Sequence, residues 1–289
     1  MNQRPNEKQI LHGYNAQNEP KKGEVASDQT SVKYNLPVSV VLRLKFNIKE
    51  TANENQFITS CIKTGNTLVF TEQNHERLII CNSDGTDIHH IHLSYKPCYM
   101  TEMDSNIVAV TCHRMILIIN ISTRSVISKI NTNDNCYGIS YNDDNLYVVI
   151  DKFKIHVMDM TGKVKRTMLA PSGLIHDITV DRNRLVCIDY TSSIYCCSLD
   201  GTLMWKLKMD KFQYLRRVTT DDEGNVYVTN ESTHNVIVVS YDGKHHSELL
   251  TESDGLNNPY GIYFDKKENI LLVSNDFDGK IILFDVNKK

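Results

Sequence analysis

The sequence predicts an all-β fold, a six-bladed β-propeller built from four-stranded blades. The first observation is a set of short apolar runs that recur about every 40 residues. The second is that a short turn and another apolar run follow each of them. The third is that the last unit has one strand fewer than the others. A strand-like stretch that belongs to no unit lies near the start of the chain. The six recurring runs begin at Leu68, Ile107, Leu146, Leu185, Val226 and Ile270.

The last unit shows the pattern most clearly. We expect three strands over Asn258–Asp265, Asn269–Asn275 and Lys280–Val286, joined by two tight turns. The second turn, Asp276–Gly279, contains an Asp-Gly pair, which is typical of a tight turn. The middle strand is almost entirely apolar, as expected for a strand that is covered on both faces.

The strand count predicts how the ring closes. Five units have a fourth strand, and the sixth ends after three. The stretch Val38–Ile48 alternates in polarity like a strand, so we expect it to supply the missing outer strand of the last blade. This closure removes an open sheet edge. We therefore expect a propeller over residues 36–289 and a disordered polar tail over residues 1–35. The other fourth strands are expected at Asp87–Ser94, Ser125–Asn131, Lys163–Leu169, Thr202–Met209 and Lys244–Leu250.

Two stretches carry a resemblance to a known repeat. They are NNPYGIYFD followed by NILLVSNDFDGKIILFDV, and NCYGISYNDDNLYVVIDKFKIHVMD. Both resemble the NHL repeat, in which a Pro-x-Gly-Ile-like first strand precedes an apolar strand that ends in Asp or Asn. More narrowly, the chain looks like the C-terminal propeller of tripartite-motif (TRIM-NHL) proteins. The resemblance implies a substrate-recognition propeller of a ubiquitin ligase, which binds a protein target.

The chain departs from that family in one respect. It has no zinc ligands spaced as in a RING finger or a B-box, so we expect no ligase activity from this chain itself. The function predicted first is a non-catalytic macromolecular interaction module with a protein partner. Because some TRIM-NHL propellers bind RNA, single-stranded RNA is the alternative partner. The oligomeric state stays open.

Candidate binding residues lie on the first strand of each blade, which lines the central channel of a propeller. Two columns of aligned positions contain aromatic rings, an imidazole and adjacent guanidiniums. Function in such a fold concentrates on the segments that a rigid scaffold presents. The partner-binding residues predicted at the channel mouth are Tyr99, Tyr137, His176, Arg216, Arg217 and Tyr260.

The charge distribution supports the RNA alternative. Net charge is -3, yet the segment from Asp151 to Arg217 contains 12 Lys and Arg residues against 7 Asp and Glu residues. Such a patch could engage an acidic protein surface or an RNA backbone, and tyrosines beside arginines can stack on single-stranded bases. The predicted RNA contacts are Lys206, Lys208, Lys211, Arg216 and Arg217.

A calcium-dependent lactonase or esterase is the third hypothesis. Its site needs several oxygen ligands around a hard cation, and the two columns offer only Asp177. His176 and Asp177 are adjacent on a strand, so they should point to opposite faces and not orient each other. We therefore predict no catalytic residue, no metal and no cofactor. Polar residues at the second-strand ends are expected to accept hydrogen bonds from the following turns; they are Glu72, Asp151, Asp189, Asn230 and Asn275.

The eight cysteines show no Cys-x-x-Cys spacing, and most lie inside expected strands. Buried reduced thiols are typical of a cytosolic protein, so we expect a cytoplasmic location. No apolar run of ~18 residues occurs, which predicts no membrane association.

Overall fold

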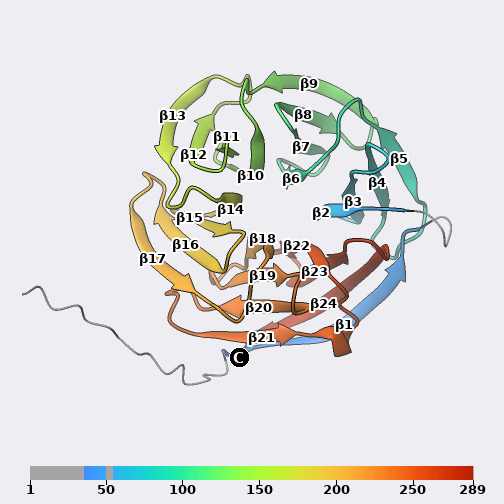
Figure 1. Cartoon of the computed structure of the whole chain (residues 1–289). Helices are drawn as coiled ribbons and strands as arrows, with labels where there is room; N and C mark the ends of the chain where they lie inside the picture. Colours follow the sequence, from blue (N-terminus) through green and yellow to red (C-terminus); the bar gives the residue numbers. More distant parts are fainter. Residues whose placement is uncertain (1–35, 50–54, 289) are drawn as a thin grey trace, which may run out of the picture. The chain divides into compact units, whose positions relative to one another are not determined.

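Six antiparallel four-stranded sheets follow one another around a ring in the computed structural model, which describes residues 36–49 and 55–288 (Figure 1). The first strand of each sheet is innermost, and the fourth lies at the circumference (Figure 1). The predicted six-bladed β-propeller is therefore confirmed. The tail expected over residues 1–35 lies outside the described residues.

The first three blades follow the chain in order. Blade one consists of β2 (Ile58–Thr64), β3 (Thr67–Glu72), β4 (Arg77–Asn82) and β5 (His89–His92). Blade two consists of β6 (Tyr99–Glu102), β7 (Ile107–Cys112), β8 (Met115–Asn120) and β9 (Ser125–Asn131). Blade three consists of β10 (Cys136–Asn142), β11 (Asn145–Ile150), β12 (Lys154–Met158) and β13 (Val164–Leu169).

The last three blades have the same strand order, except that the fourth strand of blade six comes from the N-terminal part of the chain. Blade four consists of β14 (Ile175–Asp181), β15 (Arg184–Asp189), β16 (Ser193–Ser198) and β17 (Leu203–Lys208). Blade five consists of β18 (Leu215–Thr220), β19 (Val226–Asn230), β20 (Asn235–Val239) and β21 (His246–Leu250). A short 3-10 helix, Glu252–Asp254, precedes blade six. Blade six consists of β22 (Pro259–Asp265), β23 (Ile270–Asn275), β24 (Lys280–Lys288) and β1 (Val38–Asn47).

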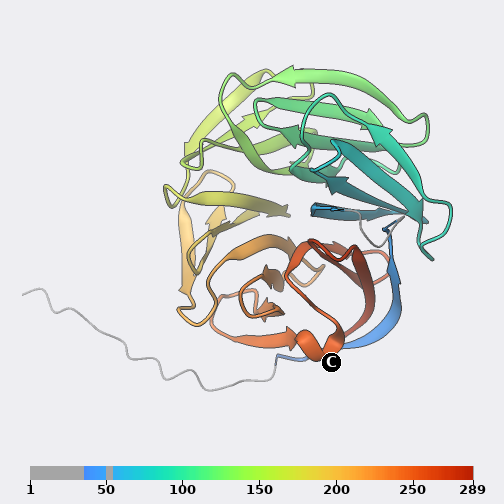
Figure 2. The same ribbon diagram turned by 45° about the vertical axis from the view of Figure 1, so that its right-hand side comes forward.

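The ring closes through β1 and β24. The two strands pair antiparallel from Val38 opposite Lys288 to Asn47 opposite Lys280, with one register shift between Leu42 and Leu44. They run side by side in both views (Figure 1 and Figure 2). Closure by the N-terminal strand is therefore as predicted, and the last blade gains its outer strand from the other end of the chain.

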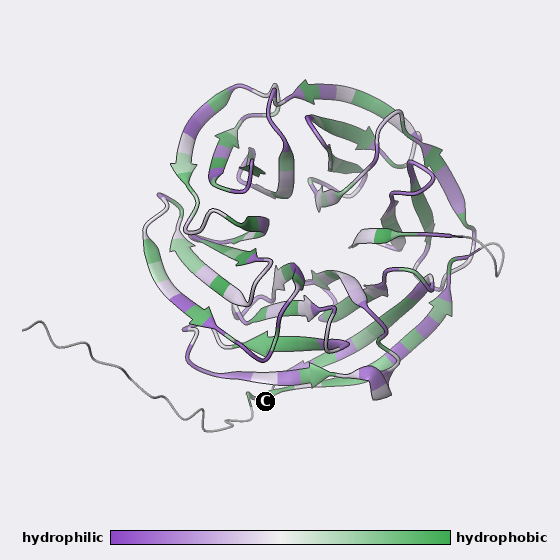
Figure 3. Ribbon diagram, in the orientation of Figure 1, coloured by the Kyte–Doolittle hydropathy of each residue, from purple (hydrophilic) through white to green (hydrophobic). Residues whose placement is uncertain are grey.

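The core lies between neighbouring blades. Val69 and Leu78 of blade one, for example, pack in one buried cluster with Val108 and Leu117 of blade two. The middle strands are hydrophobic over most of their length, whereas the connecting turns are hydrophilic (Figure 3). Each sheet thus buries both faces, because a blade stands between two others. This arrangement makes a rigid scaffold for the segments at the two ends of the strands.

The strand order defines two faces of the ring. The segments that lead into first strands and the turns between second and third strands lie together on one face, which we call the entry face. Backbone hydrogen bonds tie them to one another: Ile58 N–H donates to the Asp276 carbonyl at 2.9 Å, and Glu231 N–H donates to the Tyr214 carbonyl at 3.3 Å. The remaining turns form the opposite face.

A register irregularity recurs near the start of the first strands. At a bulge two residues oppose one, so the strict alternation of side chains is interrupted. The irregularity occurs in five first strands, beginning at Ile58, Cys136, Ile175, Leu215 and Pro259. Neighbouring residues on these strands can therefore both approach the central channel.

Glycine at the centre of the Tyr-Gly-Ile motif has a steric reason. A Cβ atom on Gly138 would lie 2.6 Å from the Cα of Asp177 and 2.8 Å from the backbone nitrogen of Ile178. We expect Gly138→Ala to lower the free energy of unfolding by about 2 kcal/mol, because the first strands of blades three and four must separate. Urea denaturation measures this change. The control is Gly173→Ala, where no atom lies within 4 Å of the new Cβ, and equal losses in both variants would contradict the steric explanation.

Candidate functional site

The six residues predicted at the channel mouth converge, but they do so at two levels. Arg217 and Tyr99 form the inner level, inside the channel. The Arg217 guanidinium carbon lies 3.7 Å from the Tyr99 ring centre and 5.0 Å from that of Tyr260. Its Nη2 donates a hydrogen bond of 2.8 Å to the Cys98 carbonyl, across the ring from blade five to blade two. Arg217 is only 4% exposed, so its side chain closes the channel at this level. We call this side chain the plug.

Asp177 balances the charge of this plug. Its Oδ2 accepts a hydrogen bond of 2.9 Å from the Val218 N–H on the neighbouring blade. Burial raises the pKa of Asp177 to about 6, although the Arg217 guanidinium opposes this rise. Burial lowers the pKa of Arg217, but Tyr99, Asp177 and Tyr260 together raise it above its usual value. Arg217 is therefore a permanent buried cation with a nearby carboxylate.

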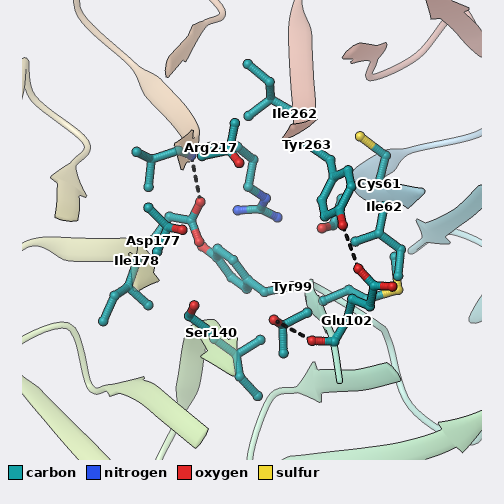
Figure 4. Close-up of a pocket in the computed structure, with 17 residues that line it drawn as sticks. Cys61, Ile62, Tyr99, Glu102, Ser140, Asp177, Ile178, Arg217, Ile262 and Tyr263 are labelled. Atoms are coloured by element: carbon teal, nitrogen blue, oxygen red, sulfur yellow. Dashed lines mark hydrogen bonds between the residues drawn. The ribbon is translucent and has the colours of Figure 1, made fainter. Parts of the chain in front are cut away.

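A cavity of about 90 Å³ lies in the channel beyond the plug (Figure 4). Its lining follows the first strands from the level of Arg217 and Asp177 towards their C-terminal ends, and therefore towards the opposite face. In this region the Tyr263 hydroxyl donates a hydrogen bond of 2.6 Å to Glu102. The volume suits about three water molecules. The entry face and the cavity are thus separated by Arg217 and the two tyrosines that hold it.

The outer level is a curved row of stacked side chains around the mouth. It begins with Phe277, whose ring stacks on that of Phe57 at 5.0 Å between ring centres. Phe57 meets Tyr260 edge to face at 5.5 Å. The Arg216 guanidinium lies 5.1 Å from the Tyr260 ring centre and 5.5 Å from that of Tyr190.

The row continues through blade three. The Lys152 ammonium lies 5.0 Å from the Tyr190 ring centre and 5.1 Å from that of Tyr137. Aromatic faces attract cations at these distances. The row therefore takes residues from five of the six blades, and it alternates rings and cations from Tyr260 to Tyr137. We call it the aromatic arc, and it consists of Phe277, Phe57, Tyr260, Arg216, Tyr190, Lys152 and Tyr137.

Arg216 is neutralised within the arc. Its Nε donates a hydrogen bond to Oε2 of Glu231, and its Nη2 forms an ion pair with the same oxygen. Both side chains are about one-fifth to one-quarter exposed, at 19% and 25%. The pair holds the guanidinium between Tyr190 and Tyr260, so Arg216 acts as part of the surface rather than as a free charge.

His176 packs against the buried side of the aromatic arc, under Tyr190. Its ring stacks on Tyr190 with 3.9 Å between ring centres and 14° between planes. Burial, followed by the guanidiniums of Arg217 and Arg216, lowers the pKa of His176 to about 3. The imidazole is therefore neutral at physiological pH. The two side chains have different contacts: the His176 ring stacks on Tyr190, and the Asp177 carboxylate accepts a hydrogen bond from Val218 N–H.

Three of the five polar residues at the second-strand ends accept hydrogen bonds from the turns that follow them, as predicted. Oδ1 of Asp189 accepts hydrogen bonds from the backbone N–H groups of Thr191 at 3.0 Å and Ser192 at 3.1 Å. Oδ1 of Asn230 accepts one from Thr233 N–H at 2.9 Å. Glu72 likewise accepts one from Asn74 N–H at 2.9 Å. Asp151 and Asn275 instead accept hydrogen bonds from the N–H groups of Asn135 and Asn257, which lie in segments that lead into first strands. Their role is structural.

Sequence reasoning missed the arc residues that come from turns. Lys152 and Tyr190 directly follow polar second-strand ends, so one column would have found these two, whereas Phe277 lies one position further along the chain. The members of that column are Gln73, Lys152, Tyr190, Glu231 and Asp276.

The predicted RNA contacts are divided between the outer strand of blade four, the segment that follows it and the channel. Lys206 lies on the outer strand β17, 5.1 Å from the Tyr195 ring centre. Lys208 pairs with Asp210 at 2.7 Å, and Lys211 pairs with Glu248. Arg216 lies at the mouth and Arg217 is buried beneath it, so these five residues form no continuous positive surface.

The cysteine thiols have low reactivity. All eight are free and seven are buried, as expected. Burial raises the pKa of Cys61 to about 12 and that of Cys136 to about 11. These thiols are therefore protonated at physiological pH and are poor nucleophiles. Within residues 36–49 and 55–288, no group of three or more His, Cys, Asp and Glu side chains could hold a metal ion.

Asp276, beside Phe277, gives the site a pH dependence. Burial raises its pKa to about 7 from a usual value of 3.8. Its Oδ1 accepts a hydrogen bond of 2.7 Å from the Phe277 N–H, and its buried Oδ2 has no hydrogen-bond partner among the described residues. A raised folded-state pKa means that this group contributes stability below pH 3.8 and that the contribution is lost as the pH rises through 7.

We therefore expect Asp276→Asn to be more stable than the wild type at pH 8, by roughly 2 kcal/mol or about 4–8 °C in Tm. The difference should shrink towards zero near pH 4, where the wild-type carboxyl is protonated. Thermal unfolding of both proteins from pH 4 to pH 8 measures it. His176 titrates in both proteins, so its effect cancels in the difference. A constant difference across this range would show that Asp276 is ionised throughout.

None of the described residues forms a helix long and apolar enough to cross a membrane.

Comparisons with known proteins support the fold but assign the chain to no family. No protein-family model matches the chain, and no curated protein sequence matches it. Among solved structures, the chain is similar to the crystal structure of a protein of unknown function from Bacteroides thetaiotaomicron. The TM-score is 0.68 at 13% identity, and the match covers 86% of this chain and 76% of the other. At this identity the likeness shows the fold alone, a six-bladed β-propeller in the part of the chain that the structure describes.

Proposed function

We propose that the propeller is a non-catalytic interaction module that binds a protein partner on its entry face, at the aromatic arc. The observation that carries this proposal is the arc itself. Protein interfaces are enriched in Tyr, Trp, Phe and Arg, and their strongest contacts are rigid aromatic and Arg anchors. The arc presents such groups already stacked, so little side-chain entropy remains to be lost on binding.

Exposed apolar side chains extend the arc over the same face. Phe277 is 49% exposed, Tyr214 53%, and Phe153 and Leu174 47% each. All four lie on turns between second and third strands or on segments that lead into first strands. Exposed apolar groups that gather around a polar mouth favour a protein-binding surface.

The state of the polar groups supports a non-catalytic role. His176 is neutral and covered by Tyr190, so it is poorly placed to exchange protons with a substrate. The channel carboxylates already accept hydrogen bonds, Asp177 from Val218 N–H and Glu102 from the Tyr263 hydroxyl.

The resemblance to TRIM-NHL proteins suggests a biological role. A propeller of this kind selects the target of a ubiquitin ligase, and a RING finger on another segment or chain recruits the conjugating enzyme. We propose the same role here, in the cytoplasm. The eight free cysteines support that compartment, because reducing conditions keep thiols unpaired.

Single-stranded RNA is the second candidate. The alternation of rings and cations along the arc favours it, because bases stack on aromatic and guanidinium planes. The distribution of charge favours it less, because Arg216 is paired with Glu231.

A photo-crosslinking amino acid tests the proposal at two matched positions. Phe277 on the entry face is 49% exposed, and Tyr241 on the opposite face is 46% exposed. In cells that express the chain, we expect a discrete protein adduct from position 277 and none from position 241. The adduct should survive ribonuclease and should disappear when Tyr190→Ala is added.

Equal adducts from both positions, or none from position 277, would overturn the assignment of the entry face. An adduct that ribonuclease removes would favour the RNA candidate. The ubiquitin role predicts further that the captured protein carries less ubiquitin when the propeller is depleted.

A further inference from the structure

We propose that the entry face recognises an acidic peptide segment, in which one Asp or Glu side chain binds Lys152 and flanking apolar side chains bind Phe153 and Leu174. This inference rests on the proposed protein-binding function and adds the chemistry of the partner.

Lys152 is a cation that the fold holds in place without a counter-ion. Its ammonium lies between the rings of Tyr137 and Tyr190, at 5.1 and 5.0 Å from their centres. Among residues 36–49 and 55–288, no carboxylate forms an ion pair with it. Nearby Lys154, by contrast, pairs with Asp134 at 2.9 Å. A carboxylate that arrives at Lys152 would form a charge-assisted hydrogen bond without displacing a partner.

The backbone fixes where this ammonium points. Asp151 and Lys152 have φ angles of 48° and 68°, both in the left-handed region, as in the tight turn of a twisted hairpin. The Asp151 carboxylate accepts hydrogen bonds from the backbone and side chain of Asn135, both at 3.2 Å. The turn is therefore anchored to the segment that leads into β10, which carries Tyr137.

Apolar groups stand beside the cation in a fixed arrangement. Ile175 N–H donates to the Lys152 carbonyl at 3.0 Å, and Ala170 N–H donates to the Phe153 carbonyl at 2.8 Å. These two bonds tie the turn to the segment that contains Leu174. Phe153 and Leu174 are each 47% exposed. The result is one unpaired positive charge next to two exposed apolar side chains, which complements an acidic residue with apolar neighbours.

The number of unpaired cations within the aromatic arc distinguishes this partner from RNA. At the mouth, Arg216 is neutralised by Glu231, and Arg217 is buried. A phosphate backbone gains affinity from several cations that follow it along a groove. A single unpaired lysine between rings matches a single carboxylate better.

A library of random dodecapeptides displayed on phage, selected on the full chain, tests the proposal. We expect the selected sequences to be enriched in Asp or Glu flanked by apolar residues. For the best synthetic peptide, replacing the acidic residue by its amide should weaken binding at least about tenfold. Lys152→Gln should cause a loss of the same size, and the two losses should not add in a double-mutant cycle.

Lys206→Gln is the matched control, because the Lys206 ammonium also lies 5.1 Å from a tyrosine ring centre but on the outer strand β17. We expect it to bind the peptide as the wild type does. Lys152→Glu should instead prefer a peptide with Lys in place of the acidic residue. Peptides without acidic enrichment, no selected peptide, or full affinity in Lys152→Gln would overturn the proposal.

Two further outcomes separate this proposal from the function on which it rests. If the crosslinker at position 277 still captures a protein while the peptide test fails, the entry face is right and the acidic chemistry is wrong. If a pool of single-stranded RNA heptamers binds, loses affinity in Lys152→Gln and competes with no peptide, RNA replaces the acidic peptide as the ligand of Lys152.

Discussion

Replacing Arg217 by Met is expected to lower the free energy of unfolding by roughly 3–5 kcal/mol, since it removes a buried cation whose charge favours the ionised form of nearby Asp177. In a domain of this size the loss corresponds to about 10 °C in Tm. The variant would leave Asp177 without its neighbouring cation and Tyr99 without the guanidinium stacked on its ring. Within the described ranges, the Cys98 carbonyl would keep only the 3.0 Å hydrogen bond from the Thr59 hydroxyl. Thermal and urea unfolding at pH 8 measure the change.

The pH dependence of this loss identifies its cause. Without Arg217 the pKa of Asp177 should rise further above its present value of about 6, because the opposing positive charge is gone. A raised pKa costs stability where the carboxyl is forced to ionise, so the loss should be larger at pH 8 than at pH 5. Asp177→Asn in the same background should restore part of the stability. A loss that is independent of pH would mean that packing, not charge, dominates.

Arg216→Met is the natural control. Arg216 is partly exposed, and its partner Glu231 is at the surface, so the loss should stay near 1 kcal/mol. The hypothesis of RNA contact at Arg217 predicts the reverse for that residue, an intact fold with weakened binding. The two substitutions therefore separate a structural plug from a surface contact.

Removing the closing strand should have the largest effect of all. A chain that begins at residue 49 lacks β1 and leaves β24 as an open edge, with Val286, Phe284 and Ile282 no longer covered from that side. We expect it to aggregate or to unfold at a much lower temperature, because an unpaired edge strand and uncovered apolar groups favour association. A chain that begins at residue 36 retains β1 and should unfold near the wild-type temperature.

Adding the missing strand as a separate peptide tests whether pairing is the cause. A synthetic peptide of residues 36–49 should raise the Tm of the truncated chain in a concentration-dependent manner. The same peptide with Val40→Asp should fail, since Val40 packs against the cluster between blades five and six. If the chain that begins at residue 49 is as stable as the wild type, the ring does not depend on β1.

The periodic features of the fold could be read from the sequence. Recurring apolar strands gave six blades, and the surplus strand Val38–Ile48 gave the closure that β1 and β24 form. Polar residues at the second-strand ends predicted the hydrogen bonds that Asp189 and Asn230 accept. The strand spacing and the turn hydrogen bonds each involve residues that are close together in the chain, so a local pattern is enough to predict them.

The candidate site depended on contacts that local patterns do not contain. Arg216 and Arg217 are adjacent in the sequence and were expected to act together, yet one pairs with Glu231 at the mouth and the other bonds to a carbonyl 119 residues away. Lys152 was counted only within the basic segment and Tyr190 was not singled out, because both come from turns rather than from first strands. By itself the sequence determined the number of blades, their order and the strand that closes the ring, because each blade repeats one local pattern. Only the tertiary structure decided which mouth residues are exposed, neutralised or buried, because bulges and neighbouring blades bring side chains from distant parts of the chain to one axis.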